Sequence, residues 1–570
     1  MDDRLYRAVP ANSLVTNLSS FLNKLGVIRT QSINKELGNV ATKPLISNIS
    51  PLKRTLLAVS VSIALGLAFA PVAHADALDN LIEKLKEKGV ITEDEYKDVI
   101  EVREGERAVA KKRRQETDEV RTKAEDRAKT EMVGNFSDGI RWESADKKNS
   151  IGLNGRMQLD YRSYGGDDAL IANTFDIRRA YLTVAGKFWD YYTFDLSADF
   201  AGLVGSDQVT TTTTTTCTAN PCNGANPGSN ISSSSTSTYN ARQKSQLDVA
   251  WFNVGWWQGA QFRFGQFKMP FSLEEQTSSR FIDFQERSVM NSLVPGKERG
   301  VMLHGTPLTG MFYGLAFSNG QGKNENENNP VADGTDLIGR VGINIAEMVG
   351  QKNAVYHLAV GFSDGKIPAA ATPSARTEGR GLQYFTTGAF TSNKADIDRT
   401  RQGLEGAVAI GPVKFQAEYT KVNYGGTTAS ASGVDFDRSI DAWYAAVNWA
   451  ITGEPYAASY RNGAFGRLRP NNNFSPNGSG WGAWELGLRY SNFDASDFQL
   501  AATNPTGSGV LNTGLTNEAK AYTVGLKWLP TPNTRFLLNY IQTDFGTPIT
   551  INSIKAEDEK AITFRAQFDF

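Results

Sequence analysis

The most constraining feature of this sequence is an alternation of apolar and polar residues that repeats along the chain and continues to its last residue. In the final ten residues, apolar side chains occupy every second position, at Ile562, Phe564, Ala566, Phe568 and Phe570, with Thr, Arg, Gln and Asp between them. Successive residues of a strand point to opposite faces, so this segment predicts a strand with one apolar and one polar face. A strand of this kind that ends on Phe is typical of the one that closes a bacterial outer-membrane β-barrel. A half-buried strand of a soluble sandwich alternates in the same way. The choice between the two folds therefore depends on whether the pattern repeats along the chain and whether the chain is exported.

An export signal precedes the alternating region. It consists of a short basic region at 53–54, an apolar run over 55–69 and the small-x-small sequence Ala73-His-Ala75, which signal peptidase cleaves. We therefore expect a signal peptide at 53–75 that is removed after Ala75, and a transmembrane anchor is the alternative. Residues 1–52 are either a leader extension or the result of a misassigned start, because a secretory signal ordinarily begins near its basic region.

The composition fits a barrel better than a helical membrane protein. Hydrophobic residues make up 40% of the chain, the mean hydropathy is −0.37, and no apolar run past residue 75 is long enough to cross a bilayer as a helix. Barrel strands halve their hydrophobicity because every second residue faces the lumen. A net charge of −1 indicates no nucleic-acid partner. With 3 His and 2 Cys, we expect no metal and no other cofactor.

The two cysteines lie in a low-complexity stretch. Cys217 and Cys222 are five residues apart within a Thr-, Ser-, Asn- and Gly-rich region. In an oxidising compartment we expect a local disulfide between them, and two free thiols are the alternative. We interpret the Thr/Ser-rich loop at 206–240 as a hydrophilic extracellular cap, with a binding loop of an adhesin as the alternative.

Residues 76–134 have helical periodicity instead. Leu78, Leu81, Ile82 and Leu85 recur at helical spacing, and the segment from 93 to 131 is dense in Glu, Lys, Arg and Ala without a proline. This pattern predicts a solvent-exposed helical arm in the periplasm. Its thin apolar seam allows either a trimerising coiled coil or a single solvated helix.

From about residue 149 onward the period switches to two. Alternating segments are separated either by turns of two to four residues or by longer polar stretches, at 202–245, 320–334, 365–401, 425–436 and 457–480. Short turns at one end and long loops at the other are typical of outer-membrane barrels. We therefore predict an all-β transmembrane barrel of about 16 antiparallel strands over 138–570, with a water-filled lumen.

Several segments resemble the phosphate-selective porin O/P family, and together they cover nearly all of the barrel region. They are Gly155-Arg-Met-Gln-Leu-Asp160, Phe175-Asp-Ile-Arg-Arg-Ala-Tyr-Leu182, Phe264-Gly-Gln-Phe-Lys-Met-Pro-Phe271, Leu273-Glu-Glu-Gln-Thr-Ser-Ser-Arg280, Gln285-Glu-Arg287, Ile451-Thr-Gly-Glu-Pro455 and Gly482-Ala-Trp-Glu-Leu486.

The resemblance implies a trimeric sixteen-stranded porin of the Gram-negative outer membrane that passes small anions such as phosphate. Its third extracellular loop would fold into the lumen and form the constriction. The segment 272–298 fits this loop, because it follows a strand, lacks alternation and is too long for a periplasmic turn. The expected partners are outer-membrane lipid, small inorganic anions, two further copies of the chain and, through Phe570, the outer-membrane assembly machinery.

Candidate pore-lining residues come from the resemblance and from strand phase. Arg156 and Tyr181 match wall positions of the family, and Arg179 shares the lumen-facing phase of Tyr181. Arg178 has the opposite phase, so it must lie at a bulge or above the lipid zone, because a charge facing the middle of a bilayer costs about 2–4 kcal/mol. The other candidates are Arg280, Arg287, Lys297 and Arg299 near the third loop and, by phase alone, Arg263, Arg340, Arg489, Lys527 and Arg565. Inward cations favour anions, but each of these residues could instead belong to a structural ion pair.

One residue departs from the family pattern. Phosphate-selective members have Lys where this chain has Glu275, and residues 270–299 carry five acidic and four basic side chains. We therefore expect a weak anion preference, with a general or cation-tolerant porin as the alternative. An enzyme is not expected, because only His304 and His357 follow the signal peptide and neither has a convincing partner serine. An adhesin or structural barrel is a further alternative.

Overall fold

The computed structural model describes residues 75–130, 132–135, 139–165, 171–201, 208–217, 231–240, 246–320, 322–323, 334–430, 433–504, 506–551 and 553–570. The leader, the predicted signal peptide up to residue 74, Cys222 and the side chain of Cys217 lie outside these residues. The chain consists of two compact units, 1–118 and 119–570, which we describe separately.

The N-terminal unit contains helix α3 (Ala75–Glu87) and the start of helix α4 (Glu93–Thr130). Gly89 ends the first helix with a φ of 65°, which favours glycine. A capping box then starts α4, because the Thr92 backbone N–H donates to Glu95 (2.9 Å) and the Glu95 N–H donates to Thr92 Oγ1 (3.3 Å). The described part of the chain contains no helix that is long and apolar enough to cross a membrane.

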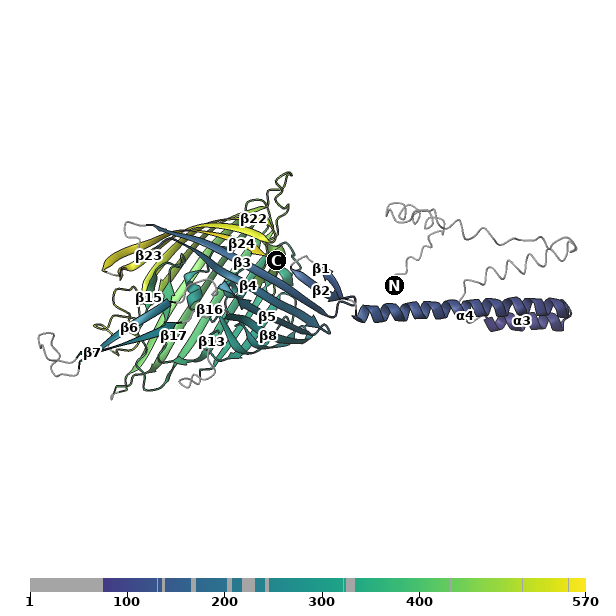
Figure 1. Ribbon diagram of the computed structural model, residues 1–570, viewed down its shortest axis with the longest axis horizontal. Coiled ribbons are helices and arrows are strands. Elements are labelled where there is room, and N and C mark those ends of the chain that lie inside the picture. The colour runs from purple at the N-terminus through teal and green to yellow at the C-terminus, as the bar shows by residue number, and fades with distance from the viewer. Residues whose placement is uncertain are drawn as a thin grey trace, which may run out of the picture. The chain divides into compact units, whose positions relative to one another are not determined.

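The second unit is a closed antiparallel barrel (Figure 1). Its sheet has 18 strands. Two of them are short, β1 (Met132–Asn135) and β2 (Ile140–Ser144), and they pair only with each other and with β3. The other 16 strands form the barrel wall. The ring closes where β24 pairs with β3, with Arg565 opposite Asp160. The prediction of about sixteen strands is confirmed.

The barrel strands follow chain order around the ring. They are β3 (Ser150–Gly165), β4 (Thr174–Phe188), β5 (Tyr192–Asp199), β8 (Gln246–Trp257), β9 (Ala260–Lys268), β10 (Lys297–Gly305), β11 (Met311–Ser318), β12 (Asp336–Asn344), β13 (Ala354–Pro368), β16 (Asp396–Ile410), β17 (Val413–Thr427), β18 (Asp435–Ala450), β21 (Ala483–Asp494), β22 (Glu518–Thr531), β23 (Thr534–Ile551) and β24 (Ile554–Asp569).

Smaller elements lie between these strands. They are the hairpins β6–β7 (Gln208–Cys217, Ile231–Asn240), β14–β15 (Ser374–Arg376, Gln383–Thr386) and β19–β20 (Tyr460–Arg461, Ala464–Phe465), the short helices α5 (Leu273–Gln276) and α6 (Ile345–Met348), and the 3₁₀ turns η3 (Val289–Ser292) and η4 (Tyr456–Ser459).

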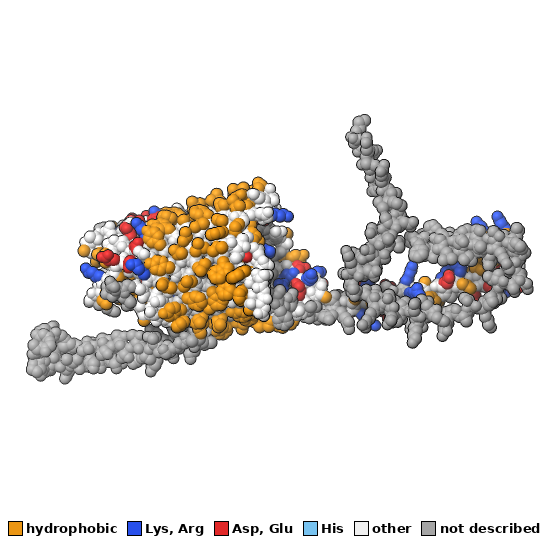
Figure 2. Space-filling view, turned by 90° about the horizontal axis from the view of Figure 1, so that it is seen from above, with side chains coloured by type: hydrophobic (Ala, Val, Ile, Leu, Met, Phe, Trp, Pro, Cys, Tyr) orange, Lys and Arg blue, Asp and Glu red, His pale blue; other side chains and the backbone are white. Residues whose placement is uncertain are grey.

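The outer wall carries a continuous apolar band, which Figure 2 shows on the face in view. Two rows of neighbouring aromatic rings mark its edges. Trp443, Tyr490 and Tyr522 form one row, and the other consists of Trp484, Trp528, Phe536 and Phe564. Aromatic girdles of this kind sit at the two membrane–water interfaces of outer-membrane barrels.

The sequence predicted short turns at one end of the barrel and long loops at the other, and one of the long segments lies at the end with the short turns. The turn at Gly411 and Pro412, the β22–β23 turn and the C-terminus lie at one end, which we call the short-turn end. The segment 451–482 lies there too, because the Ala450 N–H donates to Pro412 and the Phe474 N–H donates to Pro530. The expectation that 457–480 is one of the long loops at the opposite end was therefore wrong. Strand β18 runs toward the short-turn end, and loop length alone does not reveal that direction.

Placing a charge in the apolar band should destabilise the barrel. Leu488 points outward from β21 at 48% exposure, between Val447 and Val524 of the neighbouring strands. We expect Leu488→Arg to lower the free energy of unfolding by about 2–4 kcal/mol, measured by urea titration in lipid vesicles. Asn492→Arg, on the same face but level with Trp443 of the aromatic row and opposite Lys520, is the matched control and should cost about 0–1 kcal/mol. Equal costs for the two variants would contradict a lipid-facing band.

Candidate functional site

Three connecting segments fill much of the lumen. The L3 segment, residues 269–296, runs inward, and its Phe271, Leu273 and Met290 are at most 1% exposed. It forms one apolar cluster with the L5 segment, residues 369–395, and with wall strands β16, β17 and β18. The inward fold of the third loop is thus confirmed.

The third connection enters from the short-turn end. This short-end segment, residues 451–482, places Tyr456 and Phe465 in a second apolar cluster with Leu273. The sequence analysis did not foresee that this segment and the L5 segment fold inward. The clues were aromatic residues in stretches that we took as polar, such as Tyr384 and Phe385.

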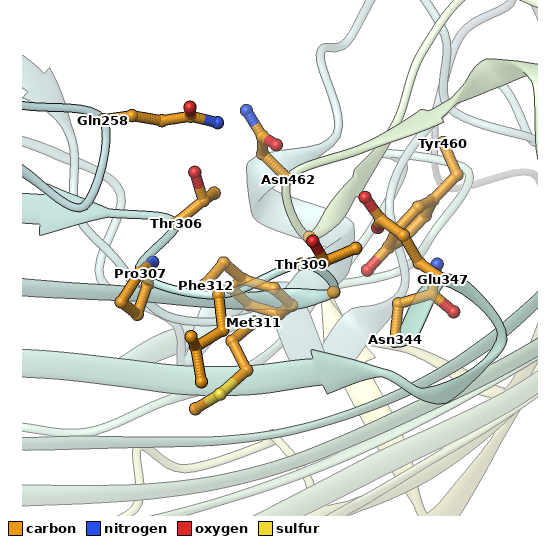
Figure 3. Close-up of a pocket in the computed structure, with 13 residues that line it drawn as sticks. Gln258, Thr306, Pro307, Thr309, Met311, Phe312, Asn344, Glu347, Tyr460 and Asn462 are labelled. Carbon is orange, nitrogen blue, oxygen red and sulfur yellow. The ribbon is translucent and has the colours of Figure 1, made fainter. Parts of the chain in front are cut away.

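The tip of the short-end segment is fastened to the wall beside a cavity of about 270 Å³ (Figure 3). The Tyr460 hydroxyl lies 2.7 Å from His357 Nδ1, and Arg340 donates to the Gly463 carbonyl at 2.8 Å. Gln258 and Asn462 face each other across the cavity in Figure 3, and none of the 13 residues that line it is Lys or Arg. This cavity therefore adds no positive charge to the lumen.

Glu275, the residue that departs from the family pattern, is buried at the base of the L3 segment. Its carboxylate lies 3.3 Å from Arg287 Nη1 and 3.8 Å from Lys268 Nζ. Both cations also donate to the Glu275 and Thr277 carbonyls. Burial raises the pKa of Glu275, but Arg287, Lys268 and Lys297 outweigh burial and hold the pKa below its usual range. Glu275 is thus an ionised carboxylate already paired with cations.

Glu286 is the centre of a buried charge network that fastens the L3 segment to the wall. Arg178 Nε lies 2.8 Å and Arg565 Nη2 2.9 Å from its Oε1, and Arg565 Nε also binds Asp160 Oδ1 at 2.6 Å. Burial raises the pKa of Glu286, but Arg178, Arg565 and Arg179 hold it well below the usual range. The side chains of Arg178 and Arg565 are therefore committed to positioning the loop.

Arg178 reaches this network because it sits at a β-bulge. In the β3–β4 pairing, Gln158 lies opposite Arg179 and Leu159 lies opposite Ile177, so Arg178 is the extra residue. A bulge was one of the two positions that strand phase allowed for Arg178. Arg179 donates to Gln158 Oε1 at 2.9 Å and is 8% exposed.

Most of the remaining inward cations also have carboxylate partners. Glu274 lies 3.5 Å from Arg489, and Asp283 lies 2.7 Å from Lys414. The predicted wall cations pair as Arg340–Glu405 (2.6 Å), Arg489–Glu378 (2.5 Å) and Lys527–Glu485 (2.5 Å). These side chains compensate buried charge instead of offering it to a permeating ion.

A different arrangement occurs on the side of the lumen formed by β3, β4, β5, β8, β9 and β10. Arg156 of β3 donates to Ser279 Oγ at 2.9 Å, and its guanidinium lies 4.4 Å from the centre of the Tyr181 ring. Arg263 of β9 lies 4.2 Å from the centre of the Trp251 ring. Among the described residues, neither arginine forms an ion pair.

Arg280 of the L3 segment faces the same region and donates to Asn154 Oδ1 at 2.7 Å. We call Arg156, Arg263 and Arg280 the arginine cluster. Asp195 of β5 interacts electrostatically with Arg263 and Arg280.

Two acidic residues lie near this cluster, and the sequence analysis did not predict them as pore-lining residues. They are Asp195 and Asp248, of which Asp248 binds Lys297 at 2.6 Å and accepts from the Tyr181 hydroxyl at 3.1 Å. Their importance depends on cross-strand register, which only the structure supplies. Arg299 of β10 lies opposite Gln266, and within the described residues its side chain forms no ion pair.

Comparisons with known proteins agree with this architecture. Residues 151–570 match the family model described as phosphate-selective porin O and P. Porin O of Pseudomonas aeruginosa is 22% identical over 452 residues, which cover 76% of this chain and 91% of that protein.

Two solved structures are also similar. An anion-selective porin from Comamonas acidovorans has a TM-score of 0.42 at 10% identity, covering 74% of this chain and 100% of that one. The outer membrane channel DcaP of Acinetobacter baumannii has a TM-score of 0.42 at 12% identity, covering 75% and 99%.

Proposed function

This chain belongs to the phosphate-selective porin O and P family and is an outer-membrane porin channel, not an enzyme, and we propose that it conducts small anions in preference to cations. The observation that carries the proposal is the arginine cluster. Arg156 and Arg263 carry charges that no carboxylate pairs with directly, among the residues that the structure describes.

The location of these charges favours anions. The apolar clusters of the L3 and short-end segments include residues of β16, β17, β18 and β21, and Phe267 of β9 and Met302 of β10 also belong to one of them. We place the water-filled path beside β3, β4, β5, β8, β9 and β10, where Arg156 and Arg263 lie. A cation at the wall of a narrow path lowers the barrier for anions and raises it for cations, and the low dielectric of the surrounding protein strengthens both effects. Stacking on Tyr181 and Trp251 leaves the guanidinium N–H edges able to donate to an anion.

The selectivity we propose is moderate. Asp195 and Asp248 lie in the same region and oppose a dianion, and Glu275 occupies a position that is Lys in phosphate-selective members. A tight phosphate site would need more uncompensated positive charge than this region offers. A general or cation-tolerant porin remains the second candidate, because acidic side chains line the same path.

The purified protein in a planar bilayer tests both candidates. We expect a reversal potential on the chloride side in a KCl gradient, and no block of the current by phosphate at micromolar concentration. Block at micromolar phosphate would contradict the moderate selectivity. A reversal potential on the potassium side would favour the cation-tolerant porin.

We further propose that the channel is a homotrimer with α3 and α4 in the periplasm, that Cys217 and Cys222 form a disulfide, and that Phe570 is read by the assembly machinery. Val102 and Val120 of α4 are 63% and 67% exposed, which supports a seam that partner helices cover. We expect a mass of three chains by native mass spectrometry in detergent, and deletion of 76–130 should shift it toward one chain. A monomeric full-length protein would contradict this arrangement.

A further inference from the structure

A second cavity, of about 520 Å³, lies at the long-loop end of the barrel. It is lined by the end of the L3 segment, the first residues of the L5 segment, Gly320 and Gly322 after β11, and the strands β10, β13, β16 and β17. We call it the vestibule cavity. It shares no residue with the arginine cluster.

Two arginines supply the polar side of the vestibule cavity. Arg399 uses Nη2 to donate to Asp336 Oδ2 (2.7 Å) and to the Gly320 carbonyl (2.9 Å). Arg401 uses Nη1 to donate to the same Asp336 oxygen (3.0 Å) and to Ser363 Oγ (3.0 Å). The other terminal nitrogen of each guanidinium makes no hydrogen bond to any described residue. Two adjacent guanidiniums with spare donors suit a carboxylate, which accepts two parallel N–H bonds.

The cavity also has apolar lining residues. Val294, Pro295, Ile367 and Pro368 line it together with Ala371. Pockets that bind small organic molecules combine such apolar walls with a few placed polar groups, and their volumes are about 300–1,000 Å³. The vestibule cavity falls within that range.

The charge balance of the cavity disfavours an inorganic dianion. Arg399 and Arg401 share one carboxylate, Asp336, and Glu298 also lines the cavity, where it accepts from Ser318 Oγ (2.5 Å) and the Gly320 N–H (3.1 Å). Two guanidiniums and two carboxylates leave no net charge. A phosphate dianion would gain little there, whereas a monoanion with an apolar body would gain from the guanidinium donors and from the apolar wall.

We propose that the vestibule cavity binds small organic monocarboxylates with an apolar or aromatic body. The carboxylate occupies the fork formed by Arg399 and Arg401, and the apolar body lies against Pro295, Ile367 and Ala371. This ligand class differs from the small inorganic anions of the arginine cluster.

Isothermal titration calorimetry on the purified full-length protein in detergent tests the proposal with benzoate, acetate and phosphate as probes. We expect benzoate to bind at least tenfold more tightly than acetate or phosphate. Arg399→Gln should weaken benzoate binding at least tenfold, and Arg401 still pairs with Asp336 in that variant. Ala371→Trp fills the cavity without changing a charge and should abolish benzoate binding.

Lys366→Gln is the matched control. Lys366 lies at the same end of the barrel, 3.5 Å from Asp396, and does not line the cavity, so its removal should leave benzoate binding unchanged. Equal affinity for benzoate and acetate, or unchanged binding in either Arg399→Gln or Ala371→Trp, would overturn the proposal. An Arg156→Gln/Arg263→Gln variant should keep benzoate binding, which separates this site from the arginine cluster.

Discussion

Replacing Arg156 and Arg263 together by glutamine is expected to abolish the anion preference of the channel. A unit charge about 10 Å from a permeating ion contributes about 1.7 kcal/mol at an effective dielectric constant of about 20. Salt in the lumen screens part of this energy, so we expect the chloride-to-potassium permeability ratio to fall by roughly tenfold in the double variant. The reversal potential in a KCl gradient measures the ratio directly.

Lys560→Gln serves as the control for this experiment. Lys560 lies on β24, and its side chain is 45% exposed beside Asp558 at 3.1 Å. Its removal changes the net charge without changing the arginine cluster, so the permeability ratio should stay the same. An unchanged ratio in the double variant would mean that Arg156 and Arg263 do not face permeating ions.

Replacing Arg565 by methionine is expected to have the largest effect on stability. Arg565 and Asp160 are both fully buried, and Arg565 also binds Glu286 of the L3 segment. Removing the cation leaves buried carboxylates without full compensation, which costs about 3–5 kcal/mol. Urea unfolding in lipid vesicles should show this loss.

The same variant should also change the pore. Loss of Arg565 removes one of the three arginines that pair with Glu286, so the L3 segment is held less firmly and the single-channel conductance should become larger or noisier. Lys560→Met, on the same strand but facing outward, removes only an exposed ion pair and should leave the unfolding energy nearly unchanged. Equal unfolding energies for the two variants would contradict the role of the buried network.

The alternation of residue types predicted the wall of the barrel well. On β24 the sequence assigned Phe564 and Phe568 to lipid and Arg565 to the lumen, and in the structure these side chains are 39%, 48% and 0% exposed. This succeeds because a period of two is a local property, since each residue's face follows from its neighbours along the strand. The cost of a charge facing lipid likewise limited Arg178 to a bulge or a position above the lipid zone, and the structure shows the bulge.

The contents of the lumen could not be deduced from local pattern. The sequence shows that residues 270–299 contain five acids and four bases, but not which of them are compensated. Glu286 and Arg565 are 279 residues apart in the chain and 2.9 Å apart in the structure. Counting the loop charges therefore overstated the negative charge that a permeating ion meets.

Sequence alone thus determined the barrel, its approximate strand number, the lipid-facing residues and the inward third loop, because these depend on local periodicity and on family motifs. Tertiary structure alone decided that the L5 and short-end segments also enter the lumen. It also decided that Arg565 and Arg489 form ion pairs, whereas Arg156 and Arg263 form none with the residues that the structure describes. Ion pairing depends on distances of a few ångströms between strands that are remote in sequence. No local sequence pattern encodes those distances, and the distances decide which charged side chains can interact with a permeating ion.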